Sequence, residues 1–249
     1  MGTLRSAGAR PRGRALSETG RWRLQRRAGT PRSLHRWSNL APVAAAPVVR
    51  VCQALGPAVV LGSTQPAGDV DESRCAALGL DLFRRRSGGG AVLVLPGSQL
   101  WVDVFVPRTD PLYVADVSAS SRWLGEAWAG AISDAVAAIA APEVLRRSPK
   151  SAPALARTLC FAGAVAGEVF LSGRKVVGLS QRRDRDGAWF HSMALLELDP
   201  TQFASVLSGG EPDRLRAAQE LEQRAAGLPG ARSVAPRLEQ SLLARIVSL

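Results

Sequence analysis

Nine residues, Arg84-Arg85-Arg86-Ser87-Gly88-Gly89-Gly90-Ala91-Val92, lie between two segments that have the composition of β-strands. Three successive glycines allow the backbone to come within hydrogen-bond range of a ligand, because no side chain stands in the way. Their N–H groups can form a concave anion site, and the arginines can pair with phosphate or carboxylate oxygens. The run has neither the Gly-Lys-Ser/Thr of a P-loop nor the glycine spacing of a dinucleotide fold. It indicates an anion-binding loop or a flexible turn in a strand-rich domain.

The segments around this loop predict alternating short strands, followed by helices towards the C-terminus. Period-two patterns and turn residues predict strands at 48–52, 57–62, 80–84, 91–95, 100–106, 157–161, 168–171, 175–181 and 189–198. Apolar spacing and terminating residues predict helices at 69–78, 121–141, 200–207, 213–226 and 236–247. The Pro96-Gly97 turn predicts that 91–95 and 100–106 form a hairpin. This order predicts an α+β fold with a mixed, largely antiparallel sheet flanked by helices.

The net charge of +11 is concentrated at the N-terminus, since residues 1–38 contain ten arginines and one acid, Glu18. We therefore expect residues 1–38 to form a basic, disordered extension that is dispensable for folding, and residues 39–249 to form the folded domain. A transit segment, or sequence translated from upstream of the true start, is an alternative reading of the same stretch. The remaining chain is nearly neutral and carries no nucleic-acid recognition motif, so we expect no nucleic-acid partner.

The other compositional signals favour a reduced cytoplasmic location. The apolar stretch 41–49 is too short to span a membrane, and the N-terminus lacks the apolar core of a secretory signal. Cys52, Cys75 and Cys160 have no metal-site spacing, and their odd number argues against a disulfide framework. We expect no membrane contact and no bound metal centre formed by these cysteines.

Lys175 stands out because 30 of the 32 basic residues are arginine. It lies in Gly173-Arg174-Lys175-Val176-Val177-Gly178-Leu179-Ser180-Gln181-Arg182, which predicts a turn followed by a strand. A lysine supplies a compact point charge on a slim stem, where arginine supplies a broad planar fork. Lys175 is therefore either a ligand-contacting charge or a surface residue of a hairpin. His191, in the following strand, is expected to be a core or edge histidine.

Taken together and in this order, these segments resemble the lipoate–protein ligase family. The family's first signature (two arginines, a small residue, Ser/Thr, Gly-Gly-Gly/Arg, Ala-Val) is similar to residues 84–92. Its second (Gly-Arg/Lys-Lys-Val/Ile-x-Gly-x-x-x-Arg) is similar to residues 173–182, and 58–62 with Gln65 resembles a third element. The resemblance covers about residues 48–200. It implies a catalytic domain over 39–249 with a fold similar to biotin–protein ligases and class II aminoacyl-tRNA synthetases.

The resemblance implies a reaction in which ATP, with Mg²⁺, activates lipoate or a related medium-chain acid as an acyl-adenylate. The acyl group then passes to a lysine of a lipoyl carrier domain or a glycine-cleavage H-type protein. Lys175 matches the lysine that contacts the acyl carbonyl and the α-phosphate. The nucleotide and adenylate positions correspond to Arg85, Ser87, Gly88, Gly89, Gly90, Ala91, Val92, Leu93 and Ser180.

Three departures from the family pattern concern the acyl pocket more than the nucleotide site. Val94 stands where a histidine is frequent, and Phe190-His191-Ser192-Met193 stands where His-His-Gly-Thr is familiar. Gly167-Glu168 replaces an Asn-Asp pair ahead of the lysine hairpin. Only residues 201–249 follow Pro200, so we expect no large C-terminal accessory domain.

Cys160-Phe161 supports an alternative reaction that uses no ATP. In octanoyl transferases of a sister branch, a Cys-Phe pair precedes the same Gly-Arg-Lys hairpin, and the cysteine forms a thioester. Cys160 could accept an octanoyl group from acyl carrier protein in this way, or could be a buried residue on a strand. Gly90, where the transferases more often have arginine, favours adenylation slightly, so the ligase is the first hypothesis. A non-catalytic acyl- or nucleotide-binding relative is the third.

Overall fold

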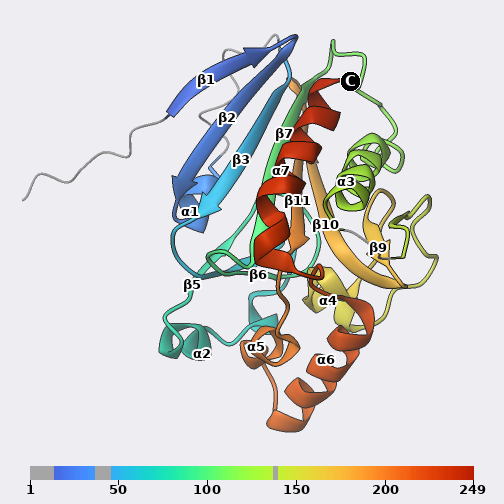
Figure 1. The fold of residues 1–249 in the computed structure, drawn as a ribbon. Coiled ribbons are helices and arrows are strands. Elements are labelled where there is room, and N and C mark those ends of the chain that lie inside the picture. The colour runs from blue at the N-terminus through green and yellow to red at the C-terminus, as the bar shows by residue number, and fades with distance from the viewer. Residues whose placement is uncertain (1–13, 37–45, 137–139) are drawn as a thin grey trace, which may run out of the picture.

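The computed structural model describes residues 14–36, 46–136 and 140–249, which form two β-sheets with helices packed around them (Figure 1). The larger sheet has eight strands in the order β1-β2-β3-β7-β11-β10-β9-β8. All neighbouring pairs are antiparallel except β2 and β3. Its strands are β1 (Arg14–Thr19), β2 (Trp22–Gly29), β3 (Val48–Ala54), β7 (Gln99–Pro107), β8 (Glu143–Val144), β9 (Val169–Leu171), β10 (Arg174–Arg183) and β11 (Gly187–Leu195).

The smaller sheet carries the glycine loop. Its strands are β4 (Ala58–Leu61), β5 (Asp81–Arg84) and β6 (Val92–Val94), with β4 in the middle. β5 runs parallel to β4, and β6 runs antiparallel to it. The loop 85–91 therefore connects the two outer strands at one end of this sheet.

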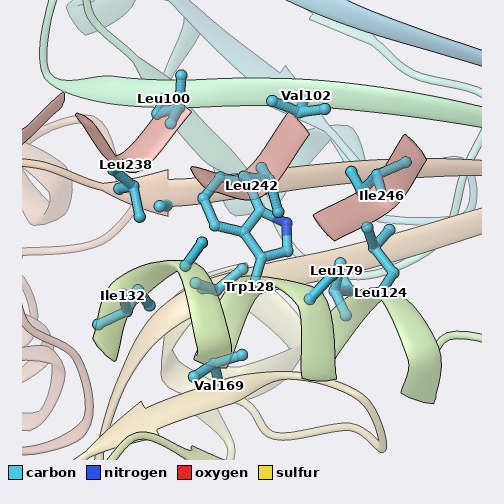
Figure 2. Packing of buried hydrophobic residues seen from close by; sticks show 14 of the residues in the cluster. Leu100, Val102, Leu124, Trp128, Ile132, Val169, Leu179, Leu238, Leu242 and Ile246 are labelled. Carbon is cyan, nitrogen blue, oxygen red and sulfur yellow. The ribbon is translucent and has the colours of Figure 1, made fainter. Parts of the chain in front are cut away.

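Helices α3 (Arg122–Ala135) and α7 (Ala231–Val247) cover one face of the larger sheet (Figure 1). The side chains of β7 alternate, so that Val102, Val104 and Val106 face these helices. Trp128 is fully buried between the two helices and the sheet (Figure 2). Its neighbours in this core include Leu100, Leu124, Ile132, Val169, Leu179, Leu238, Leu242 and Ile246.

A second apolar core joins the smaller sheet to the helices at the lower end of the molecule in Figure 1. Buried residues of β4 and β6 pack there against Phe161, Phe203 and Leu221. The helices outside the first core are α1 (Pro31–Leu34), α2 (Glu72–Ala77), α4 (Leu155–Thr158), α5 (Pro200–Ser205) and α6 (Glu211–Arg224), with 3₁₀ turns at Ala67–Asp69 and Cys160–Ala162.

The α+β class and the largely antiparallel sheet are confirmed, whereas two local predictions are wrong. Segments 91–95 and 100–106 are not a hairpin, because β6 and β7 belong to different sheets. The Gln99 side chain accepts from the Leu95 N–H (3.0 Å) and donates to the Leu93 carbonyl (3.3 Å), which satisfies groups that a hairpin ladder would pair. Segment 157–161 is not a strand; Cys160 begins a 3₁₀ turn after α4.

The prediction that residues 1–38 are disordered is wrong for residues 14–36, and the folded domain begins before residue 39. β2 pairs with β3 along its length, and the Trp22 side chain is fully buried in the core beneath α3 and α7. Arginines on an exposed strand or helix surface can keep their charge in water while their stems cover the sheet. Their number therefore gave a misleading signal of disorder. Residues 1–13 and 37–38 lie outside the described residues.

Candidate acyl-transfer site

The glycine loop is shaped by the buried guanidinium of Arg85. Its Nη2 donates to the carbonyl oxygens of Gly88 (2.6 Å) and Gly90 (2.9 Å), and its Nη1 donates to Val60 O (3.1 Å). Its Nε donates to Ser87 Oγ (3.2 Å), which lies 3.0 Å from Ser180 Oγ. Burial lowers the pKa of Arg85, whereas nearby Cys160 raises it. Arg85 therefore stabilises the loop from its buried side, through hydrogen bonds to loop carbonyls, and does not project into solvent.

The loop lies against the chain around Cys160 so closely that only glycine fits. A Cβ on Gly90 would lie 2.8–2.9 Å from backbone atoms of Thr158, Leu159 and Cys160. Ala91 donates its N–H to Thr158 O (2.7 Å) and accepts from the Cys160 N–H (3.0 Å). The loop predicted to bind a nucleotide and the cysteine predicted to form a thioester therefore lie in direct contact.

Of the three glycine N–H groups in the loop, those of Gly88 and Gly89 are accessible to a ligand, whereas Gly90 is buried against residues 158–160. Arg85 turns the carbonyls of Gly88 and Gly90 inward, and Gly88 and Gly89 are exposed. Within the part of the chain that the structure describes, none of these three N–H groups has a hydrogen-bond acceptor. Successive unpaired N–H groups can hold a phosphate, a carboxylate or the oxyanion of an acyl-transfer intermediate.

Lys175 is a buried ion-pair residue. Its Nζ lies 2.9 and 3.0 Å from the two carboxylate oxygens of Glu168 and 2.6 Å from the carbonyl oxygen of Cys160. These three acceptors match the three hydrogens of an ammonium group. Both side chains are about 1% exposed, and the Glu168 carboxylate also accepts N–H groups from Val165 and Leu179. Burial raises the pKa of Glu168, although Lys175 and these hydrogen bonds oppose the shift.

The Cys160 thiol lies beside both the glycine loop and Arg85. A Cβ placed on Gly89 would be 3.8 Å from Cys160 Sγ and 3.0 Å from Arg85 Nη2, so the two atoms flank the same point. Cys160 is half-buried, whereas Cys52 and Cys75 are buried. Among the hydrogen bonds that Arg85 makes in the described chain, none is to a carboxylate. Its positive charge is thus available to stabilise a negative charge on the sulfur.

Cys160, Leu179 and Ser180 separate two cavities. The outer cleft, with a volume of about 600 Å³, is lined by the glycine loop, Glu168 and Lys175. The inner pocket is far smaller, with a volume of about 40 Å³, and is mainly apolar. It is lined by His35, Val60, Arg85, Val92, Val94, Trp101, Phe161, Gly178, His191, Ser192 and Met193 together with the three separating residues. A mainly apolar pocket with a few polar side chains in its lining has the chemical character of a small-molecule site.

A row of polar residues crosses four neighbouring strands on the face of the sheet that the inner pocket occupies. The strand register places Ser180 opposite His191, His191 opposite Asp103, and Asp103 opposite Arg50. Asp103 lies 2.6 Å from His191 Nδ1 and 2.7 Å from Arg50 Nη2, and it accepts from Trp101 Nε1 at 2.6 Å. Burial would raise the pKa of Asp103, but His191 and Arg50 together lower it well below its usual value. Burial lowers the pKa of His191, against the effect of Asp103.

The structure brings most of the sequence-predicted site residues together. Lys175, Cys160, Arg85, Ser180 and the loop 87–90 line or support the two cavities. Val92 lines the inner pocket, whereas Ala91 and Leu93 are buried in the second core; only Ala91 bonds the chain around Cys160, through its backbone. His191 is buried on the interior strand β11, as expected of a core histidine, and it also lines the pocket and pairs with Asp103.

Three residues of the site were missed by sequence reasoning: Glu168, Asp103 and His35. Asp103 had a usable signal, because a charged residue in the middle of an apolar strand requires a buried partner. Glu168 precedes the lysine hairpin and is the acid nearest to Lys175 along the chain. This proximity in sequence could have indicated the Glu168–Lys175 ion pair. His35 had no signal, since it lies in the segment expected to be disordered.

Comparison with known proteins agrees with this geometry. Residues 33–233 match the family described as the lipoyl protein ligase A/B catalytic domain. The chain belongs to this family. The match includes the glycine loop, the lysine hairpin and Cys160, so the suspected family membership is confirmed. No helix in the described ranges is long and apolar enough to cross a membrane.

Curated relatives of this ligase-family chain are named octanoyltransferase LipM. The protein from Kyrpidia tusciae is 32% identical over 75% of this chain and 69% of its own length. The protein from Clostridioides difficile is 24% identical over 64% of this chain and 58% of its own length. Their name matches the alternative reaction rather than the first hypothesis.

Solved structures of lipoate–protein ligases have the same fold. A lipoate–protein ligase A bound with ATP superposes with a TM-score of 0.68 at 19% identity, over 93% of this chain and 85% of that chain. A bipartite ligase from Thermoplasma acidophilum, studied with its E2 lipoyl domain, gives 0.67 at 17% identity, over 92% and 82%. These matches establish the fold. They do not distinguish ATP-dependent ligation from thioester transfer, so that distinction depends on the residues of the site.

Proposed function

We propose that this chain transfers a medium-chain acyl group, such as octanoyl, from an acyl carrier protein to a lysine of a lipoyl carrier domain through a thioester on Cys160. The observation that carries the proposal is the position of Cys160: a half-buried thiol between the outer cleft and an apolar pocket, beside the Arg85 guanidinium. The names of the curated relatives support the same reaction. The first hypothesis, ATP-dependent ligation, becomes the second candidate.

In the first half-reaction, the Cys160 thiolate attacks the thioester carbonyl of the acyl donor. The carrier thiolate leaves, so one carbon–sulfur bond breaks as another forms. The N–H groups of Gly88 and Gly89 can stabilise the oxyanion of the intermediate, because the loop at Gly89 lies beside the sulfur and neither group has an acceptor among the described residues. Arg85 stabilises the attacking sulfur, and the apolar pocket that adjoins Cys160 is the place we propose for the acyl chain.

In the second half-reaction, the acceptor lysine amine attacks the acyl-Cys160 thioester and Cys160 leaves as a thiolate. The proton that the amine loses balances the proton that the released carrier thiolate gains. Lys175 holds the carbonyl of Cys160 and keeps a positive charge at the cleft side of the nucleophile. Because Glu168 fixes the Lys175 ammonium, Lys175 positions the Cys160 backbone and supplies a positive charge beside it.

The second candidate is adenylation of lipoate or octanoate with ATP and Mg²⁺, followed by transfer to the same acceptor. The unpaired N–H groups of the glycine loop favour it, because they suit a phosphate as well as an oxyanion. No three His, Cys, Asp or Glu side chains of the described ranges gather as a metal site. We propose Mg²⁺ only as the companion of bound ATP.

A transfer assay with a purified lipoyl domain separates the two reactions. We expect modification by octanoyl acyl carrier protein without ATP, and mass spectrometry should trap one octanoyl group on Cys160. Cys160→Ser should abolish transfer, and Lys175→Ala should reduce it about a hundredfold or more. Cys75→Ser, which alters another thiol outside both cavities, should remain active.

The opposite pattern would identify the ligase. Modification that requires free acid, ATP and Mg²⁺, and that survives Cys160→Ser, would overturn the thioester mechanism. Nucleotide binding without any modification of the lipoyl domain would indicate the non-catalytic relative.

A further inference from the structure

His35, from the N-terminal segment, forms part of the inner pocket. Its ring centroid lies 4.6 Å from that of His191, 4.7 Å from that of Trp101 and 5.5 Å from that of Phe83. The preceding α1 is held by the Arg32–Asp81 ion pair and by Arg50, which donates to the Leu34 carbonyl. These contacts of α1 fix the position of His35, which forms one wall of the pocket.

The pocket runs across the sheet from Cys160 to His35. Cys160 adjoins β10, because the neighbouring Phe161 ring contacts Gly178 and Lys175 binds the Cys160 carbonyl. The His35 ring packs at a tilt against Trp101 of β7, and β7 is separated from β10 by β11. Two strand spacings amount to about 9–10 Å. An extended medium-chain acyl group attached to Cys160 would therefore reach His35 with its distal end.

One ring nitrogen of His35, a partly exposed residue, is buried without serving the fold. Its Nδ1 is buried and has no hydrogen-bond partner among the described residues. Burial, and next the neighbouring His191, lower the pKa of His35 well below its usual value, which favours the neutral imidazole. A neutral ring can pack against an acyl chain and still offer one nitrogen to a polar atom.

We propose that His35 is a specificity-determining residue that closes the acyl pocket and reads the distal end of the chain. This inference rests on the proposed function, because it assigns the inner pocket to the acyl group. The ring volume limits the chain to medium length. At that length, Nδ1 favours an acyl group that carries a hydrogen-bonding atom at its distal end, because burying an unpaired nitrogen against a saturated chain is unfavourable.

A panel of acyl donors tests the proposal in the full chain. Transfer from octanoyl, 8-hydroxyoctanoyl and dodecanoyl carrier protein is compared for the wild type, His35→Ala and His35→Phe. We expect the wild type to prefer 8-hydroxyoctanoyl over octanoyl several-fold and to reject dodecanoyl. His35→Ala should raise the dodecanoyl-to-octanoyl ratio about tenfold or more, because it removes the wall. His35→Phe should keep the length limit and lose the hydroxyl preference.

A control variant and the wild-type activity keep the outcomes distinct. Arg36→Ala changes an exposed residue of the same segment and should leave the donor profile unchanged. Identical donor profiles in the wild type and both His35 variants would overturn the inference, even with full transfer activity. No transfer from any donor by the wild type would instead contradict the proposed function. If His35→Ala fails to fold, the profile of His35→Phe, which retains a stacked ring, decides the hydroxyl preference.

Discussion

At the scale of single residues, the site depends on charges that are buried in defined pairs. Lys175 was recognisable in the sequence because lysine is rare in this chain. Its partner Glu168 was not assigned, since the pairing depends on how β9 and β10 turn back on each other. Hydrogen bonds from Val165 and Leu179 hold the Glu168 carboxylate in place. The pair therefore positions the cationic group with little freedom to move.

Glu168→Gln should destabilise the protein and reduce acyl transfer together. The substitution leaves the buried Lys175 ammonium without its counter-charge, which costs about 3–5 kcal/mol when one partner of a buried pair is removed. Urea unfolding measures the free energy of unfolding, and the lipoyl-domain assay measures transfer.

The double variant Glu168→Gln/Lys175→Met separates stability from activity. Replacing both charges removes the unpaired ammonium, so most of the stability should return. Transfer should stay low, because no positive charge remains at the Cys160 carbonyl. Wild-type transfer by this double variant would show that the pair has only a structural role.

At the scale of elements, the glycine loop and the turn at Cys160 form one unit. The composition of residues 84–92 predicted a loop, although it left open whether the loop binds an anion or is a flexible turn. The contact between the loop and residues 158–160 could not be predicted. It joins segments about 70 residues apart, and the turn itself was expected to be a strand. Local patterns identify such segments, and tertiary packing decides which of them meet.

Gly90→Ala should impair both stability and transfer, whereas Gly88→Ala should be tolerated. The added methyl group at residue 90 would overlap the backbone at 2.8–2.9 Å and displace Cys160. A methyl group at residue 88 meets no atom within 4 Å and keeps the N–H group in place. Thermal unfolding and the initial transfer rate compare the two variants. Equal rates for both would show that the close packing at Gly90 is not required.

At the scale of the whole molecule, the large sheet connects the N-terminal segment to the outer cleft. Most strands after residue 48 were predicted within a few residues, because their alternation and turns are local signals. The sheet order was not predictable, since β7 lies between β3 and β11 and none of these pairs is a hairpin. The contribution of β2 was hidden by its arginines. Trp22 was the residue that could have revealed it, since a tryptophan inside an arginine-rich segment requires burial.

A chain shortened to begin at residue 37 should lose its cooperative fold. The deletion removes β2, exposes the edge of β3 and takes the fully buried Trp22 out of the main core. An uncovered edge strand also promotes aggregation. Trp22→Ala alone should cost about 3–5 kcal/mol. Arg32→Ala, which removes an exposed ion pair in the same segment, should cost at most about 1 kcal/mol. Calorimetry and size-exclusion chromatography of the three proteins make the comparison. A shortened chain that stays monomeric and melts within a few degrees of the full protein would show that the segment is dispensable.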